Sequence, residues 1–169
     1  GNVRYCPVCD GFETQKQRVA VLGRWSHGLR ESLFIAGFDN QVTWLAMCSQ
    51  QDVPPQELAQ LRERGVLIAD QMPAHIRCVP GQGIEVEMLD GRQLVFDVLY
   101  PALGLRHESE LAVQLGAEAQ ADGQLTVDDH LQTTVPGLYV AGDIAAGLNQ
   151  ISVAYGHAAI AATAIHNSL

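Results

Sequence analysis

The feature of the sequence that most constrains the fold is a pair of short apolar runs separated by a segment with helical periodicity. The first run, over residues 18–23, reads Arg-Val-Ala-Val-Leu-Gly, and the second, over 42–47, reads Val-Thr-Trp-Leu-Ala-Met. Both runs have the length and composition of buried parallel strands. Between them, residues 28–38 carry apolar side chains at the spacing of one helix face. Strand, helix and strand at this separation predict a right-handed βαβ unit.

Downstream, the pattern changes to short segments of partly alternating polarity, separated by glycine-containing turns: 75–79, 83–89 and 93–99. Asp90-Gly91, between the last two, is a strong hairpin signal, so an antiparallel meander is predicted inside the α/β unit. The other expected elements are a short helix over 56–64, an apolar segment over 99–104, an amphipathic piece over 109–115, two strand-like runs over 125–127 and 137–141, and an Ala-rich helix over 151–169. The predicted class is α/β, with a Rossmann-like lobe over 1–105 and a second segment over 106–169.

Charge and hydropathy exclude several classes of function. The chain has 169 residues, 47% apolar and 17% charged, which is enough to bury a core and too little charge for disorder. Ten Lys and Arg against 19 Asp and Glu leave a formal net charge of −9, which repels phosphate backbones and anionic membranes. No apolar run approaches the roughly 18 residues of a membrane span, and no targeting signal opens the chain. We therefore expect a cytoplasmic protein that binds neither nucleic acid nor membrane.

Two of the four cysteines stand close together, because residues 6–9 read Cys-Pro-Val-Cys, the C-x-x-C spacing. This spacing serves zinc when a second pair or histidines follow at matching intervals, but Cys48 and Cys78 stand alone and the six histidines are scattered. No metal site is therefore expected. The second use of the spacing is redox chemistry, in which the two sulfurs close a small disulfide ring. Two reduced cysteines without a role are the third alternative, which the polar, glycine-containing surroundings disfavour.

Gly23, Ser26 and Gly28 lie where a dinucleotide-binding turn would join the first strand to the helix, and they are the candidate nucleotide-binding residues. In the dinucleotide fingerprint the middle glycine admits the pyrophosphate, but Trp25 fills that place here. The run over 46–61 also contains no Lys or Arg to select the extra phosphate of NADPH. A working site for NADPH or NADH and an altered or vestigial site both stay open. Trp25 is either a packing residue or a lid over the turn.

Two longer motifs lie toward opposite ends of the chain. Residues 4–11 read Arg-Tyr-Cys-Pro-Val-Cys-Asp-Gly, and residues 134–143 read Thr-Val-Pro-Gly-Leu-Tyr-Val-Ala-Gly-Asp. They resemble the cysteine pair and the C-terminal flavin signature of the low-molecular-weight thioredoxin reductase family, whose members are FAD- and NAD(P)-dependent pyridine nucleotide-disulfide oxidoreductases. The resemblance covers essentially the whole chain, and it implies a nucleotide lobe followed by the C-terminal segment of an FAD-binding lobe. Family members carry an N-terminal FAD lobe ahead of the cysteine pair, so we expect a fragment that alone binds FAD weakly or not at all.

The resemblance implies a role for each residue around the cysteine pair. Cys9 would face the flavin, Cys6 would exchange with the partner disulfide, and Asp10 would carry the proton. This division suits the chemistry, because thiol–disulfide exchange needs an attacking thiolate and a protonated leaving group. Apart from the family, Asp10 reads as a turn residue before Gly11.

On the flavin side, the resemblance implies four cofactor-binding residues: Gly142, Asp143, Gln150 and Ile151. Asp143 would hydrogen-bond the ribityl chain of FAD, and backbone amides at the start of the last helix would face the flavin ring and stabilise negative charge on it. Apart from the family, Gly142 and Asp143 form an ordinary strand-end turn.

The expected activity is that of a flavin-dependent disulfide oxidoreductase, in which reduced FAD passes electrons to the Cys6–Cys9 disulfide and on to a partner disulfide. The implied partner is a thioredoxin-like protein or a small dithiol or disulfide. Family members are often dimers, so a homodimer is a further expectation. Two alternatives stay open: a branch of the family that oxidises dithiols with oxygen or uses a donor other than NADPH, and a non-catalytic redox or binding module.

Overall fold

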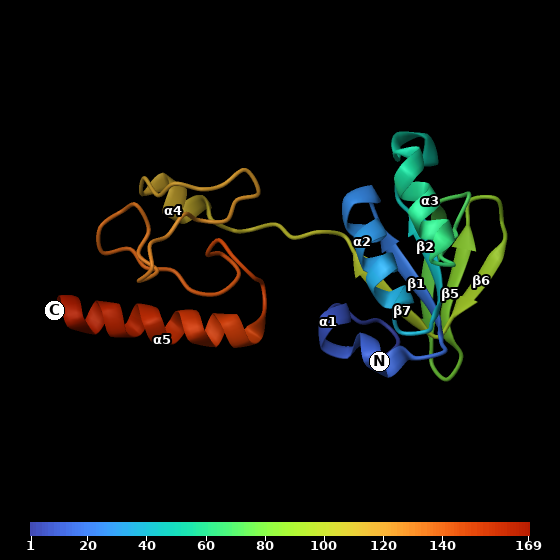
Figure 1. Ribbon diagram of the computed structural model, residues 1–169, viewed down its shortest axis with the longest axis horizontal. Helices are drawn as coiled ribbons and strands as arrows, with labels where there is room; N and C mark the ends of the chain where they lie inside the picture. Colours follow the sequence, from blue (N-terminus) through green and yellow to red (C-terminus); the bar gives the residue numbers. More distant parts are fainter. The chain divides into compact units, whose positions relative to one another are not determined.

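The chain divides into two units, Gly1–Gly104 and Leu105–Leu169, in a computed structural model that describes residues 1–169 (Figure 1). The first unit has three layers, which are helices, a parallel sheet and an antiparallel sheet. The second unit contains loops linked by single β-bridges, a short helix and one long helix. The α/β class expected from the sequence is confirmed.

A four-stranded parallel sheet lies at the centre of the first unit, in the order β3-β2-β1-β7. Its strands are β1 (Arg18–Gly23), β2 (Gln41–Ala46), β3 (Leu67–Ile68) and β7 (Val98–Ala102). Val21 of β1 pairs with Trp44 of β2 on one side and with Tyr100 of β7 on the other, and all three are fully buried. The two apolar runs that predicted parallel strands are therefore neighbours in the core of the sheet.

Helices cover one face of this sheet. The helical segments of the first unit are α1 (Pro7–Asp10), η1 (Gly11–Thr14), α2 (Trp25–Ala36), η2 (Gln50–Asp52) and α3 (Pro55–Glu63). Ile35 of α2 and Leu61 of α3 share one buried cluster with Val21 and Trp44 of the sheet. The helix expected over 28–38 in fact begins at Trp25, three residues earlier. The first turn of α2 depends on a tertiary contact, because the Trp25 ring packs against that cluster. The apolar periodicity of the sequence indicates only the later turns.

The other face of the parallel sheet packs against an antiparallel sheet, the expected meander. Its strands are β4 (Pro73–Val79), β5 (Gly83–Met88) and β6 (Gln93–Phe96), paired in the order β4-β5-β6. Side chains alternate along β1, so Val19 and Val21 lie in the helix-side cluster while Ala20 lies in the cluster with Ile84 and Val86 of β5. Both faces of β1 are therefore buried, as its continuous apolar run requires.

The single strand expected over 93–99 is wrong, because the chain changes sheets inside it. β6 ends at Phe96, and β7 begins at Val98 in the parallel sheet. Between them, the Asp97 carboxylate accepts hydrogen bonds from the backbone amide and the guanidinium of Arg18, at 2.8 Å and 2.7 Å. These bonds also hold the pKa of Asp97 below its ordinary value. The change of sheet therefore rests on a tertiary contact with β1.

The second unit contains α4 (Glu110–Gln114) and α5 (Ile151–Ser168), and the long helix confirms the Ala-rich helix of the sequence. The strand-like runs at 125–127 and 137–141 are wrong as strands, because their residues make only isolated bridges, such as Leu125 with Ala145. Positive φ angles at Gly137 and Gly142 bend the second run at both ends and shorten it. Leu125, fully buried, lies at the centre of this small core.

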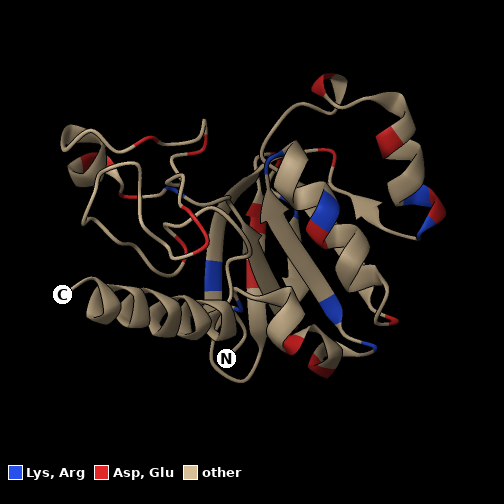
Figure 2. Cartoon of the chain, turned by 60° about the vertical axis from the view of Figure 1, so that its left-hand side comes forward, with Lys and Arg blue, Asp and Glu red and all other residues tan.

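Charged residues are spread over the chain without gathering into a basic patch (Figure 2). Arg106 is the sole Lys or Arg of the second unit. In the first unit several arginines form local ion pairs, including Arg77 with Glu85 and Arg92 with both Asp70 and Asp90. None of the helices combines the length and the apolar composition that crossing a membrane requires.

Candidate active site around the Cys6–Cys9 disulfide

The cysteine pair closes a disulfide across one helical turn. Cys6 is the N-cap of α1, and its carbonyl accepts hydrogen bonds from the amides of Cys9 and Asp10, at 2.9 Å and 3.2 Å. Pro7 occupies the first turn, where its fixed φ suits a helix start and its missing N–H costs no bond. The Cα atoms of Cys6 and Cys9 are 5.2 Å apart, within the usual range for a disulfide. Cys9 is exposed and Cys6 half-buried, so the disulfide is accessible at the surface of the first unit.

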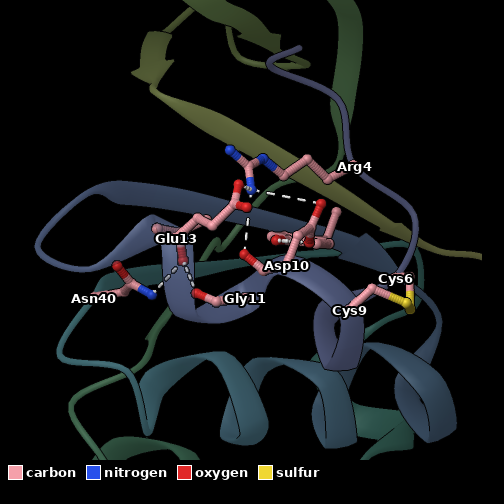
Figure 3. A network of polar contacts seen from close by, with 9 residues as sticks. Arg4, Cys6, Cys9, Asp10, Gly11, Glu13 and Asn40 are labelled. Carbon is pink, nitrogen blue, oxygen red and sulfur yellow. Dashed lines mark hydrogen bonds and ion pairs between the residues drawn. A yellow bond between two sulfur atoms is a disulfide. The ribbon is translucent and has the colours of Figure 1, made fainter.

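The carboxylate of Asp10 is held by two donors from outside its own helix. The Tyr100 hydroxyl donates to Asp10 Oδ1 at 2.6 Å, and Arg4 Nη1 lies 3.5 Å from Asp10 Oδ2. Figure 3 shows the Asp10 side chain directed toward Arg4, on the same short helix as the disulfide. Asp10 is therefore a tertiary anchor rather than a local turn residue, since its side chain does not cap η1.

The positions of the two donors follow from β7. Residues 2–4 run alongside this strand, with the Arg4 amide donating to the Leu99 carbonyl at 2.9 Å, and this pairing brings the Arg4 side chain over α1. Tyr100 is the next residue of the strand, and its ring lies in the helix-side core with no exposed surface. Burial and the hydrogen bond to Asp10 raise the pKa of Tyr100 above its ordinary value. The hydroxyl consequently keeps its proton and remains a donor.

The segment after the disulfide is also fixed. Asn40 Nδ2 donates to Thr14 Oγ1 at 2.8 Å and to the Ile35 carbonyl at 3.2 Å, which ties η1 to the end of α2 (Figure 3). A Cβ added at Gly11 would lie 3.0 Å from the Phe38 ring, so only a glycine fits there without a shift. The disulfide turn is therefore clamped on both sides.

Around the disulfide, large apolar side chains face solvent. Tyr5, Val8 and Phe12 are 79%, 63% and 59% exposed; Val8 lies between the two cysteines, and Tyr5 and Phe12 lie on either side of the pair in sequence. Exposed apolar groups gathered in this way provide contact area for another molecule.

At the end of β1, the two outer glycines of the fingerprint are required by packing. A Cβ at Gly23 would overlap the carbonyl oxygen of Ala102 in β7, and a Cβ at Gly28 would overlap the indole nitrogen of Trp44. Trp44 Nε1 itself donates to the Gly23 carbonyl at 3.0 Å. Both glycines are therefore explained by close contact within the fold, without any ligand.

The expected turn over 23–28 is only one residue long, because β1 ends at Gly23 and α2 begins at Trp25. Ser26 lies on α2, exposed, with its hydroxyl 3.0 Å from Nδ1 of His27. The Trp25 indole N–H is hydrogen-bonded to the Glu57 carboxylate on α3. This bond and its core contacts make Trp25 a packing residue that joins α2 to α3.

A hollow of about 400 Å³ lies at the carboxyl end of β2, where doubly wound folds place the adenosine ribose. Its lining includes Cys48, Ser49 and Gln50, and Asp70, whose carboxylate is paired with Arg92. No Lys or Arg lines it. The hollow therefore offers no free cation to a phosphate.

In the second unit, the implied flavin residues belong to a braced loop. Gly142 has a φ of +82°, a conformation that favours glycine, and Asp143, which follows it, is exposed to solvent. Buried Gln124 donates to the Asp143 carbonyl at 3.2 Å and to Asn149 Oδ1 at 3.1 Å. Gln124 thus connects the Gly142–Asp143 turn to the residues before α5.

The start of α5 has free backbone donors. Gln150 is its N-cap, half-buried, and no side chain caps the first turn. Ile151 follows with 77% of its surface exposed. In an 18-residue helix such uncapped amides carry a partial positive charge that suits an anionic group.

The fold and the disulfide together define a class of protein. The profile of the pyridine nucleotide-disulphide oxidoreductase family matches residues 1–158, so the chain belongs to this family. One subunit of the alkyl hydroperoxide reductase of Pseudomonas putida is 29% identical over 99% of this chain, and thioredoxin reductase of Aquifex aeolicus is 27% identical over 84% of it. The crystal structure of thioredoxin reductase from Streptococcus pyogenes MGAS5005 matches with a TM-score of 0.83 at 22% identity, over 98% of this chain and 56% of that one.

The chain spans 34% and 46% of the lengths of the two curated relatives. The resemblance inferred from the two sequence motifs is confirmed at the level of the family and the fold.

Sequence reasoning missed three residues of these sites: Arg4, Tyr100 and Gln124. Tyr100 lies 90 positions from Asp10, and Gln124 lies 19 from Asp143. No local motif marks either contact. The weak available signal for Tyr100 is a hydroxyl-bearing residue inside a run that otherwise reads as buried strand, since a buried hydroxyl needs a partner.

Proposed function

We propose that this chain carries the exchangeable disulfide of a thioredoxin reductase-like, flavin-dependent oxidoreductase. The observation that supports the proposal most directly is the accessible Cys6–Cys9 disulfide on a turn clamped by Asp10. In this proposal the first unit is the pyridine-nucleotide-type lobe that bears the disulfide. The second unit is the C-terminal segment of the FAD-binding lobe. The proposed setting is the cytoplasm, where a C-x-x-C pair beside a βαβ unit serves redox exchange.

The exchange chemistry uses the chain's own groups. A partner thiolate forms a bond to one sulfur of the pair, the Cys6–Cys9 bond breaks, and the displaced sulfur leaves as a thiolate that takes up a proton. A second partner thiolate completes the reaction, so the partner dithiol loses two electrons and the pair gains them. When the reduced pair reduces a partner disulfide, the same steps run in reverse. We assign partner exchange to Cys6, the flavin side to Cys9, and proton transfer to Asp10.

The second unit fits FAD. Asp143 carries a carboxylate that can accept hydrogen bonds from ribityl hydroxyls, and the uncapped amides at Gln150 and Ile151 suit the electron-rich edge of the ring. Gly142 lets the backbone turn so that Asp143 is presented, and Gln124 braces that turn. Bound FAD supplies the two-electron chemistry of the disulfide.

The test is a redox cycle on the chain that carries Cys48→Ser and Cys78→Ser. After incubation with dithiothreitol and its removal, iodoacetamide is expected to modify two more sites than in the oxidised chain, Cys6 and Cys9. Mixing the reduced chain with an oxidised thioredoxin-like protein or a small aromatic disulfide is expected to protect both sites again. Intact-mass analysis counts the modifications. A pair that resists the dithiol under native conditions, or that cannot reduce either disulfide, would contradict the proposal.

Residues at the end of β1 do not fit a nicotinamide dinucleotide. Trp25 occupies the place of the glycine that admits the pyrophosphate, and its bond to Glu57 holds the indole there beside a carboxylate. The outer glycines are accounted for by packing. These observations favour a second candidate function, a dithiol oxidase. In that case a partner dithiol becomes a disulfide and the pair takes up its two electrons and two protons. Molecular oxygen finally accepts these electrons and protons and leaves as hydrogen peroxide, which restores the Cys6–Cys9 disulfide.

We expect no saturable binding of NADPH or NADH to the chain up to about 1 mM, measured by calorimetry. Glu57→Gln is the matched control, because it keeps an acceptor oxygen for the indole and removes the charge. If the indole is the obstacle, this variant also fails to bind. Binding by the unsubstituted chain at micromolar concentration would overturn the exclusion and support an NAD(P)H-dependent reductase.

A further inference from the structure

One buried hydroxyl is aimed at the disulfide turn and has no part in the proposed exchange. Tyr100 has no exposed surface, yet its hydroxyl lies 2.6 Å from the half-buried carboxylate of Asp10, whose neighbour in the chain is Cys9. A phenylalanine ring would fill the same space in the core. The hydroxyl therefore does something that packing does not require.

The charge balance around Asp10 indicates what the hydroxyl does. A carboxylate next to a cysteine opposes the negative charge that forms on sulfur when the disulfide opens, because like charges destabilise one another. Tyr100 donates to one oxygen of Asp10, and Arg4 lies near the other. Together they offset the charge of Asp10 before any sulfur becomes anionic.

We infer that Tyr100 is a positioning residue, which with Arg4 holds the Asp10 carboxylate and balances its charge beside the Cys6–Cys9 disulfide. The inference rests on the proposed function, because it concerns the same pair. Tyr100 lies on β7, at the opposite end of the first unit's sequence from the cysteines. The inference therefore gives a residue distant in sequence a part in how the two thiols ionise.

The hydroxyl is available over the whole working range of pH. Burial and the Asp10 carboxylate raise the pKa of Tyr100 above the ordinary value of about 10, so the hydroxyl stays protonated through neutral and mildly alkaline pH. The stabilisation from this donor is therefore present below about pH 10 and is lost as pH rises toward the higher pKa of the folded chain. The other ionisable groups on the elements next to α1 are Glu13 on η1 and His27, Arg30 and Glu31 on α2. Of these, Glu13 accepts a hydrogen bond from Arg4 at 2.8 Å and so competes with Asp10 for the same cation.

The test measures how the reduced thiols ionise, using the chain that carries Cys48→Ser and Cys78→Ser. The rate of alkylation by iodoacetamide at Cys9 and Cys6 is followed from pH 5 to pH 10 by peptide mass analysis, since only the thiolate reacts. Tyr100→Phe is expected to move the Cys9 profile to higher pH by about half a unit, which lowers its alkylation rate at pH 7 about threefold. Asp10→Asn is expected to move the profile to lower pH, because it removes the opposing charge.

The double variant separates this role from a structural one. If Tyr100 acts through the charge of Asp10, adding Tyr100→Phe to Asp10→Asn has no further effect on the profile. An equal shift in both backgrounds, or no shift with Tyr100→Phe alone, would overturn the inference. Arg4→Gln provides a second route should Tyr100→Phe fail to fold, and it is expected to move the profile in the same direction as that variant.

A matched control is Tyr139→Phe, which removes the hydroxyl of another hydrogen-bonded tyrosine, the partner of Gln132 in the second unit. It is expected to leave the Cys9 profile unchanged. Failure of the proposed function looks different, because the pair would then not cycle with dithiols at all. A pair that cycles normally while Tyr100 and Asp10 act independently refutes only the positioning role of Tyr100.

Discussion

Replacing Gly23 by alanine is expected to destabilise the first unit by about 3 kcal/mol, with no nucleotide present. The new Cβ would overlap the carbonyl oxygen of Ala102, a backbone atom of β7 that has no rotamer to change. Relief would require β1 and β7 to separate within the parallel sheet. Urea unfolding followed by tryptophan fluorescence measures the effect, since Trp25 and Trp44 both lie in the first unit.

Two comparisons sharpen this prediction. Gly28→Ala places its Cβ against the Trp44 side chain, so Trp44→Phe should recover part of its cost, whereas no side-chain change nearby rescues Gly23→Ala. Gly156→Ala is the control, because nothing lies within 4 Å of its added Cβ on α5. It should leave the fluorescence midpoint unchanged and favour the helix by about 0.5–1 kcal/mol. If Gly23→Ala folds as stably as the unsubstituted chain, the packing account of the fingerprint glycines is wrong.

Substitution of either cysteine of the pair is expected to abolish the redox cycle with a thioredoxin-like partner, by about 10³-fold or more. The remaining thiol can attack a partner disulfide, but it lacks a neighbour to release the mixed disulfide. Cys9→Ser should therefore trap the partner on Cys6, if Cys6 is the residue that exchanges. Cys6→Ser should trap less of the partner protein, because the remaining Cys9 is assigned to the flavin side. Non-reducing electrophoresis and mass analysis of the adduct measure both outcomes.

The chain supplies matched controls for this experiment. Cys48 is a half-buried free thiol and Cys78 an exposed one, and Cys48→Ser and Cys78→Ser are expected to leave the cycle unchanged. Comparing Cys6→Ser with Cys9→Ser tests the assignment, because Cys9 is the more exposed of the two cysteines whereas Cys6 is the one assigned to partner exchange. Preferential trapping on Cys9 would reverse the assignment. Efficient cycling by either single variant would remove the pair from the mechanism.

How far the sequence predicts this molecule depends on the range of the interactions involved. The apolar run at 18–23 predicts β1 because both faces of a central parallel strand must be apolar. The helix start at Trp25 and the break at Asp97 were missed because each depends on a contact outside the local window, the indole with the core and the carboxylate with Arg18. The runs at 125–127 and 137–141 look like strands locally but lack a full neighbouring strand to pair with.

The class of fold, the cysteine pair and the family all follow from the amino-acid sequence, because they depend on periodicity and on residues close together in the chain. The sequence alone also shows that Trp25, and not a glycine, occupies the middle position of the fingerprint. The packing role of Gly23 and Gly28, and the contact that holds Asp10 to Tyr100 from 90 positions away, required the three-dimensional arrangement. Hydrogen bonds and close contacts act over a few ångströms in space, whatever the separation along the chain, so no local pattern of residues reveals them.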